Sequence, residues 1–274
     1  MSTRVRAPAV AGSFYPADSD ELRVTVEGLL AEARSGEAEH PKADGPQTLP
    51  KALVAPHAGY AYSGPVAASA YALLEGAAAS DIQRVVLLGP AHRWPFQGLA
   101  LPDVEAFATP LGEVALDAVA VAVVLESPHV RVLDEAHHHE HSLEVHLPFL
   151  QMALGEFTLV PLVVGDARVG EVADVLRLIW GGPETLIIIS SDLSHFLTYD
   201  EALEIDGSTA AAIEALTPDA IQSHQACGRI PLGGLLVVAA ERGLRVHRQD
   251  LRNSGDTAGS HDRVVGYGAW AFKP

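Results

Sequence analysis

The sequence contains a single cysteine, Cys227, among 274 residues. One thiol cannot form a disulfide within the chain, so a fold stabilised by disulfides is excluded. The scarcity of cysteine also favours a reducing compartment. A chain of this length can bury a sizeable core without cross-links, and its 48% of apolar residues is typical of a soluble globular protein.

Basic residues are scarce as well. Lys and Arg number 18 against 35 Asp and Glu, which gives a formal net charge of −17. Binding to the phosphate backbone of nucleic acid needs a basic face, so we expect no nucleic-acid partner. The excess of acidic residues is instead predicted to form a solvated surface.

Long apolar runs are missing. The longest, such as LLVVAA, are far too short to cross a bilayer. The stretch MSTRVRAPAVAGSFYP lacks the apolar segment of a signal peptide. We therefore predict a cytoplasmic protein without membrane association. The P-loop, the dinucleotide-binding glycine pattern and the Gly-x-Ser-x-Gly elbow are also lacking, which argues against the enzyme classes built on them.

Several segments show the pattern of strands buried on both faces, because they are nearly continuous runs of apolar, often β-branched residues. These are Lys51–Pro56, Gln83–Pro90, Phe157–Gly165 and Thr185–Asp192. Helical patterns occupy Ala118–Glu126, Ser142–Leu154, Val169–Trp180, Tyr199–Ala215 and Leu232–Arg242, and a further one follows the first strand at 65–76. The alternation predicts an α/β fold: a single-domain α/β/α sandwich over residues 1–274, with a central, mainly parallel mixed sheet.

Three further segments carry weaker signals. Asp262–Phe272 partly alternates and is predicted to be an edge strand of the sheet. Ala108–Asp117 contains Pro–Leu–Gly between two extended pieces and predicts a short hairpin. Ser35–Pro50, rich in Glu, Gly, Pro and Lys, is predicted to be a solvated connection.

Three of the predicted strands are each followed closely by a histidine. These are His57 in PHAGYAYSG, His92 in GPAHRWP and His195 in SSDLSHF. Ligands of open parallel sheets bind beyond the carboxyl ends of the strands, so these histidines are expected to converge on one crevice. Neutral imidazole is the commonest transition-metal ligand. We therefore predict that His57 and His92 bind a metal ion.

Cys227 could provide a third ligand, as a thiolate deprotonated by the metal. The alternative is a small buried hydrophobe, and spacing alone does not decide between the two. The glycines after Cys227 favour a close approach of the backbone to its surroundings. Arg229, two residues further on, is assigned to the same pocket.

Asp192 and His195 occur together in SSDLSH. A carboxylate three residues from an imidazole can orient it and raise its basicity, so we predict an acid–base role for this pair. In a simpler interpretation, Asp192 caps a following helix and His195 lies at its start.

The histidine-rich segment 135–154 resembles a metal-binding tract but lacks the HExxH order. We predict that His141, Glu144 and His146 surround the metal pocket at the start of a helix. A solvated helix face is the alternative for each of them. His137–His139 are predicted to lie in a surface loop.

Six motifs occur in this order: AGSFYP, APHAGYAYSG, LLGPAH, EHSLEVHLPFL, ISSDLSH and CGRIPLGG. Together they closely resemble the Memo family, whose prokaryotic members are often labelled component B of an AmmeMemoRadiSam system. The resemblance extends from about Val5 to the C-terminus. Memo proteins are in turn similar to class III extradiol ring-cleavage dioxygenases, which bind Fe(II) through two histidines and a glutamate.

The resemblance implies that His57 and His92 are the two histidine ligands. It also implies that Cys227 occupies the position of the glutamate and that His195 matches the catalytic histidine of the dioxygenases. The family is described as binding copper or iron. Some relatives carry a second histidine directly after the GPxH motif, where this chain has Arg93.

The change from carboxylate to thiolate has a chemical consequence. Two histidines and a carboxylate suit Fe(II), whereas a softer thiolate shifts the preference toward copper or zinc. Three functions follow: a metal-dependent redox enzyme, a metal-binding adaptor that works with a radical-SAM partner protein, and a zinc hydrolase with a metal-bound water. Fold and site location transfer between relatives more readily than activity does.

Overall fold

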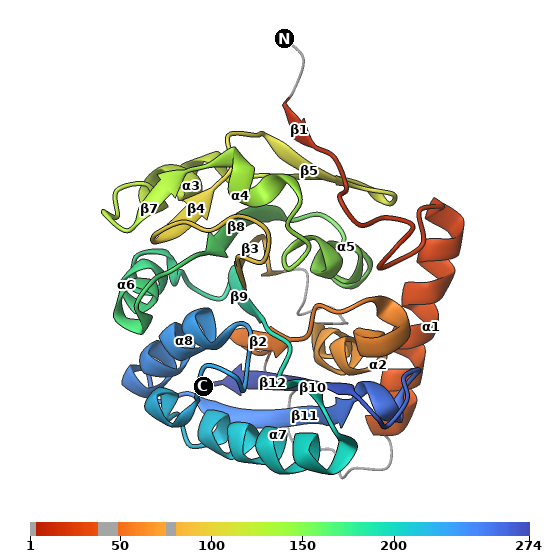
Figure 1. Cartoon of the computed structure of the whole chain (residues 1–274). Helices are drawn as coiled ribbons and strands as arrows, with labels where there is room; N and C mark the ends of the chain where they lie inside the picture. Colours follow the sequence, from red (N-terminus) through yellow and green to blue (C-terminus); the bar gives the residue numbers. More distant parts are fainter. Residues whose placement is uncertain (1–3, 38–48, 75–80) are drawn as a thin grey trace.

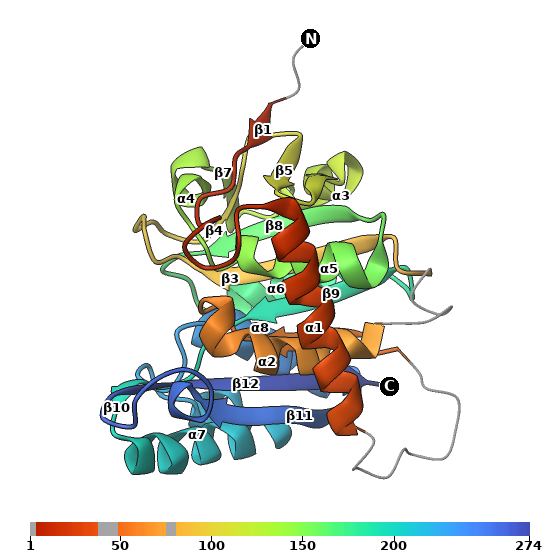
Figure 2. The same ribbon diagram turned by 90° about the vertical axis from the view of Figure 1, so that its right-hand side faces the viewer.

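A nine-stranded mixed sheet forms the centre of the protein. We describe it from a computed structural model, in which residues 4–37, 49–74 and 81–274 are described. The strand order is β10-β12-β2-β9-β3-β8-β4-β7, and β11 pairs with β12. Figures 1 and 2 show the sheet from two directions, with helices on both faces. This arrangement confirms the predicted α/β class and the mixed sheet.

The middle of the sheet consists of the four strands predicted from their apolar runs. They are β2 (Ala52–Ala55), β9 (Thr185–Ser190), β3 (Arg84–Pro90) and β8 (Thr158–Val164). Neighbours in this group run parallel, so their carboxyl ends meet at one edge. Strand β9 lies between β2 and β3, and its residue Ile188 pairs with Leu53 on one side and Leu87 on the other. Both faces are covered, which is why almost every residue of these strands is apolar.

Two layers of helices bury the two faces of this sheet. One layer holds α1 (Ser19–Glu37), α2 (Tyr60–Tyr71) with the short helix η1 (Ala72–Leu74), and α5 (Leu147–Leu154). The other holds α3 (Ala118–Val124), α6 (Val169–Ile179), α7 (Tyr199–Glu214) and α8 (Arg229–Glu241). Figure 1 places α1, α2 and α5 on one side and α6 and α8 on the other. None of the described helices is both long and apolar enough to cross a membrane.

Local sequence signals set several helix boundaries. Asp117 is the N-cap of α3, because its Oδ1 accepts the backbone N–H of Ala120 at 2.9 Å. Gly155, with φ of +74°, follows the last residue of α5 in a conformation that favours glycine. Helices α6 and α8 approach closely at Gly234, where a Cβ atom would lie 2.4 Å from Cγ1 of Val172.

The prediction of an edge strand near the C-terminus was wrong. The segment forms β12 (Val264–Lys273), which pairs antiparallel with β2 on the sheet's interior and with β11 (Arg245–Asn253). Its side chains are almost all buried. Strand β11 was not predicted, because its sequence RVHRQDLRN is polar and half-exposed. The alternation at the start of β12 is therefore no sign of an edge.

Short elements complete the chain. The predicted hairpin is confirmed as β5 (Ala106–Thr109) and β6 (Gly112–Ala115), which form a three-stranded sheet with β1 (Val5–Arg6). The remaining short elements are β4 (Leu99–Leu101), β7 (Val130–Val132), α4 (Asp134–His138), η3 (Glu144–His146), β10 (His195–Leu197), η4 (Pro218–Ala220) and η5 (Ser254–Asp256). Most of the predicted connection Ser35–Pro50 lies outside the described residues.

The histidine-rich segment differs from its prediction in two ways. The helix predicted over Ser142–Leu154 begins later: η3 leads into α5, which starts at Leu147 next to Pro148. His137 is not in a surface loop but buried in α4, where its Nε2 lies 2.9 Å from the carbonyl oxygen of Ala100. His138 and His139 are exposed, as predicted.

Candidate metal centre at the carboxyl ends of the parallel strands

His57 is buried two residues beyond the end of β2. Its Nδ1 lies 2.6 Å from Oγ of Ser190, and that hydroxyl donates its hydrogen to the carbonyl oxygen of Ser142 at 2.5 Å. A hydroxyl has one hydrogen to donate, so Ser190 accepts from Nδ1–H of His57. This fixes the tautomer and leaves a lone pair on Nε2.

His92 follows the end of β3 and is held by Glu140. Nδ1 of His92 lies 2.9 Å from Oε1 of Glu140, and the backbone N–H of His92 donates to Oε2 at 2.6 Å. Glu140 also accepts the backbone N–H groups of His141 and Ser142, each at 3.0 Å. A carboxylate that accepts Nδ1–H leaves Nε2 of His92 as the free donor atom, the usual arrangement behind metal-binding histidines.

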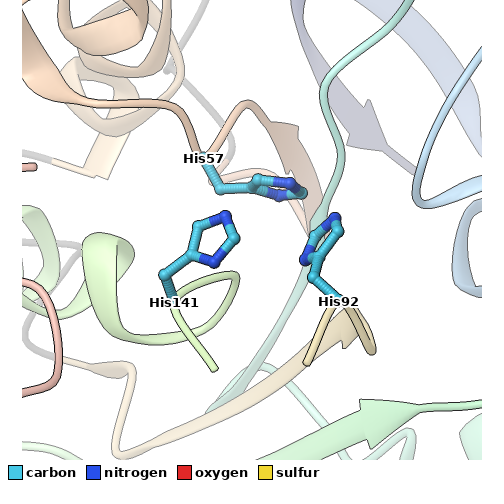
Figure 3. Close-up of side chains that lie close together, drawn as sticks. All are labelled: His57, His92 and His141. Carbon is cyan, nitrogen blue, oxygen red and sulfur yellow. The ribbon is translucent and has the colours of Figure 1, made fainter. Parts of the chain in front are cut away.

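The third ring of this cluster is that of His141, in the loop before η3. Ligand atoms of His57, His92 and His141 all lie within 4.8 Å of one another. Figure 3 shows the three side chains reaching toward one another from separate segments, and the centroids of the His92 and His141 rings are 4.8 Å apart. Phe14 of the AGSFYP motif packs against His141, with ring centroids also 4.8 Å apart.

Burial disfavours protonation of two of these rings, those of His57 and His141. Burial lowers the pKa of His57 well below its usual value, and the neighbouring rings of His92 and His141 lower it further. Burial likewise lowers the pKa of His141 to about 4. Burial alone would raise the pKa of Glu140, but the ring and backbone of His92 outweigh it and lower this pKa to about 2. Neutral His57 and His141 have the protonation state that a metal-binding imidazole requires.

Cys227 lies beside this cluster on the turn before α8. Its Sγ is 3.3 Å from Nε2 of His57 and 3.6 Å from the carbonyl oxygen of Asp192. The turn passes close to the end of β9 because the next residue is glycine: a Cβ atom on Gly228 would lie 2.5 Å from the carbonyl oxygen of Ser190. Burial raises the pKa of the Cys227 thiol, and the charge of Asp192 raises it further.

Asp192 and His195 approach the same crevice from beyond β9. Oδ1 of Asp192 accepts the backbone N–H of His57 at 2.7 Å, and Oδ2 lies 3.9 Å from Nε2 of His57. Burial raises the pKa of Asp192 to about 6. Nδ1 of His195 donates to the carbonyl oxygen of Leu193 at 2.8 Å, so Nε2 is its basic atom when the ring is neutral.

The simpler interpretation of SSDLSH as a helix start was wrong. His195 lies in β10, and the next helix begins at Tyr199 after a capping box formed by Thr198 and Glu201. Asp192 does not cap this helix; its carboxylate accepts the backbone N–H of His57.

The residues predicted to surround the pocket lie in different places. Glu144 is fully buried, and among the described residues it accepts four hydrogen bonds, from Arg6, Ala9, Val10 and Tyr15 of the N-terminal segment. His146 is buried with Nδ1 2.7 Å from the Tyr71 hydroxyl, and burial lowers its pKa to about 3. Arg229 is half-buried at the first position of α8. The alternative of a solvated helix face is thus wrong for Glu144 and His146.

A cavity of about 270 Å³ adjoins Cys227. Its lining is mainly apolar and includes Pro90, Phe96, Val164 and Ile230, with Asp166 as an acidic group. This cavity provides space for a small organic molecule next to Cys227.

The residues present fit a transition-metal ion. Three imidazoles and a thiol are donors for copper, iron or zinc. Nδ1 of His141 is buried without a hydrogen-bond partner in the described part of the chain, although Oε1 of Glu140 lies 3.3 Å away. A short distance with an unfavourable direction is not a hydrogen bond, so this contact leaves Nδ1 of His141 unsatisfied. A positive charge bound between these rings would compensate for the buried Glu140 carboxylate.

Comparison with known proteins identifies the family of this chain. A family model described as "Memo-like protein" matches residues 6–271. The chain belongs to the Memo family. It is 36% identical to a "MEMO1 family protein" of Aquifex aeolicus, over 96% of this chain and 97% of that protein. It is 38% identical to a MEMO1 family protein of Methanopyrus kandleri, over 98% and 99% of the two chains.

A solved structure resembles this Memo family protein in fold. The crystal structure of an uncharacterized protein from Escherichia coli K12 matches with a TM-score of 0.51 and 14% identity, over 80% of this chain and 99% of that one. At this identity the likeness concerns the fold alone.

Two features of this site were not predicted from the sequence. Glu140 and Ser190 were not expected as partners of His92 and His57, although Glu140 directly precedes His141. His141 was expected only to surround the pocket, because it follows no strand. A histidine placed at the site by a loop gives no periodic signal in the sequence.

Proposed function

We propose that this Memo family protein binds a single redox-active transition-metal ion between His57, His92 and Cys227, and that it carries out metal-dependent oxidation of a small organic substrate. His141 is available as a further ligand. The observation that supports the proposal most directly is the convergence of three imidazoles, with Sγ of Cys227 3.3 Å from Nε2 of His57.

The residues around the cluster support this role by fixing orientation. Ser190 and Glu140 each accept an Nδ1–H and so direct Nε2 of His57 and His92 inward. The backbone of His57 is held by Asp192. These contacts preorganise the donor atoms, which raises metal affinity because little reorganisation accompanies binding.

The same end of the sheet supplies acid–base groups. Nε2 of His195 can accept a proton from a substrate hydroxyl, since its Nδ1–H is used by Leu193. The Asp192 carboxyl, whose pKa burial raises to about 6, can exchange a proton near neutral pH. A bound copper or iron ion would supply Lewis acidity and electron transfer.

The donor set also bears on which metal is preferred. Nitrogen and sulfur donors favour copper or zinc relative to the carboxylate-containing sites of Fe(II) oxygenases. We propose copper or iron as the working metal. Zinc has no redox chemistry and would support only hydrolysis.

Anaerobic reconstitution tests the proposal. Protein prepared without metal is loaded separately with Fe(II), Cu and Zn, and oxygen uptake is measured with catechol and its substituted relatives. We expect turnover with Fe(II) or Cu, none with Zn, and at least about a hundredfold loss in His195→Gln, as expected for removal of a general base. No oxygen uptake with either redox metal and any catechol would reject oxidation of this substrate class.

Metal content tests the site separately from activity. We expect about one metal ion per chain in the wild type and a clear loss in His57→Ala and His92→Ala. His224→Ala is the matched control, since His224 is exposed and lies on the loop before Cys227. Equal metal content in all these proteins would show that the ion binds elsewhere.

A further inference from the structure

A larger cavity lies at the opposite end of the sheet from the histidine cluster. Its volume is about 580 Å³, within the range of small-molecule sites. Lys51 directly precedes β2 and lines this cavity, whereas His57 follows the other end of the same strand. At about 3.3 Å per residue, the two ends are roughly 20 Å apart. The metal centre and this cavity are therefore separate sites.

The lining combines an apolar surface with two cations. Apolar side chains include Ile82, Trp180, Pro183 and Leu244, and the cations are Lys51 and Arg242. Both cations contact the same aromatic ring: Nζ of Lys51 lies 5.5 Å and Cζ of Arg242 lies 4.7 Å from the centroid of Trp180. Trp180 thus holds two positive groups together at one wall.

Among the described residues, the hydrogen bonds of Lys51 leave one of its three hydrogens for a ligand. Nζ donates to the carbonyl oxygens of Gly182 at 2.7 Å and Thr185 at 2.6 Å, which use two of its three hydrogens. Burial lowers the pKa of Lys51 to about 8, so the ammonium form predominates at pH 7. An anion next to this group would stabilise its charge.

The charge of the lining is opposite to that of the chain. The sequence carries 18 basic and 35 acidic residues, yet the described lining has two basic side chains and one acidic side chain, Asp81. Nearby Glu184 is engaged with the backbone N–H of Gly182 and the hydroxyl of Thr185. A lining that combines positive side chains with an apolar surface is complementary to a molecule that has one anionic group and an apolar body.

We infer that this cavity is a second binding site, for a small organic anion with an apolar body. The acid group contacts Lys51 and Arg242, and the apolar body packs against Ile82, Pro183 and Leu244. The inference does not depend on the metal centre, because it uses none of the residues there.

The test uses 8-anilinonaphthalene-1-sulfonate, an apolar aromatic anion whose fluorescence rises on binding, with the full-length protein at pH 7. We expect saturable binding of one molecule per chain and at least fivefold weaker binding in Arg242→Gln. Charge reversal in Arg242→Glu should weaken it further. Arg168→Gln is the matched control, because Arg168 is exposed and lies at the other end of α6 from Trp180.

The uncharged relative N-phenyl-1-naphthylamine tests the need for a negative charge, and we expect it to bind at least tenfold more weakly. Circular dichroism of each variant shows whether the fold is kept; Arg242 is exposed, so we expect it to be. Absence of saturable binding overturns the inference, as does equal binding by Arg242→Gln and wild type. Equally tight binding of the uncharged probe would overturn its anionic part.

Discussion

Sγ of Cys227 lies 3.3 Å from Nε2 of His57, although 170 residues separate them in the sequence. The contact joins the lone thiol of the chain to a ring whose tautomer is already fixed by Ser190. It places a soft donor next to the Nε2 lone pair of His57, so Cys227 can share a metal ion with that ring.

Metal loading should release a proton from Cys227. Burial and Asp192 raise the pKa of this thiol, so it is protonated at pH 7 before metal binds. A thiolate ligand must lose that proton, and we expect the wild type to release about one proton per metal ion bound. Cys227→Ser should release none. Titration calorimetry in buffers of different ionisation enthalpy measures the number. Equal release by both proteins would assign the third ligand position to His141 instead.

Replacement of Glu140 should weaken both metal binding and stability. The pKa of Glu140 is lowered to about 2 in the folded protein, so its stabilising contribution is complete above its usual value of 4.5 and is lost as the pH falls toward 2. The shift corresponds to about 3 kcal/mol. We expect the free energy of unfolding of Glu140→Gln to be lower than that of wild type at pH 7, with the difference shrinking between pH 5 and 2.

Metal affinity provides a second measurement on the same variant. Loss of a carboxylate behind a ligand histidine typically weakens affinity by about 10–100-fold, and we expect this for Glu140→Gln. Glu113→Gln, an equal change of charge at an exposed position of β6, is the control. A Glu140→Gln protein that matches this control at every pH would contradict the assigned role.

Gly228→Ala should disturb the turn that carries Cys227. The new Cβ would lie 2.5 Å from the carbonyl oxygen of Ser190 and 2.6 Å from Cβ of Ser191. We expect a loss of about 1–3 kcal/mol in the free energy of unfolding by urea denaturation, together with weaker metal binding. At Gly207 in α7 the added Cβ would meet no atom of the described residues within 4 Å apart from its own helix backbone and chain neighbours, so Gly207→Ala should be about 0.5–1 kcal/mol more stable than wild type. Similar values for the two variants would refute the close approach.

Glu144 should be important for stability. It is fully buried, and its Oε2 accepts from Nη1 of Arg6 at 2.7 Å. Glu144→Gln leaves the Arg6 guanidinium buried without a counter-charge, and we expect a loss of about 3–5 kcal/mol in urea denaturation. Asp103→Asn, which removes the acid of the exposed Arg4–Asp103 pair, should cost less than about 1 kcal/mol. A small effect at Glu144 would show that the N-terminal segment is held mainly by apolar packing.

Much of the fold could be predicted because parallel strands that are buried on both faces appear in the sequence as continuous apolar runs. Each of β2, β3, β8 and β9 is a nearly unbroken apolar run, and His57 and His92 were located by the ends of those runs. Strand β11 was missed because one of its faces is solvated and its sequence is polar. Strand β12 was placed at an edge because alternation cannot show how many neighbours a strand has.

Long-range contacts explain the rest of the differences. His137 is buried because α4 packs against β4, and nothing in three successive histidines indicates which of them faces inward. Glu144 was expected near the metal, but its partners Arg6 and Tyr15 lie about 130 residues earlier in the chain. The proposed ligand roles, the radical-SAM partner and the cytoplasmic location stay predictions.

The position of β9 between β2 and β3 has a consequence for biosynthesis. His57 and His92 lie at the ends of two strands that become neighbours of a common third strand only when Thr185–Ser190 is inserted between them. A chain still being synthesised, with β2 and β3 complete but β9 absent, cannot hold these two rings at their final spacing. Cys227 is added later still. Acquisition of metal is therefore expected to be a late event, after most of the chain has left the ribosome, and the ion would stabilise only the completed fold.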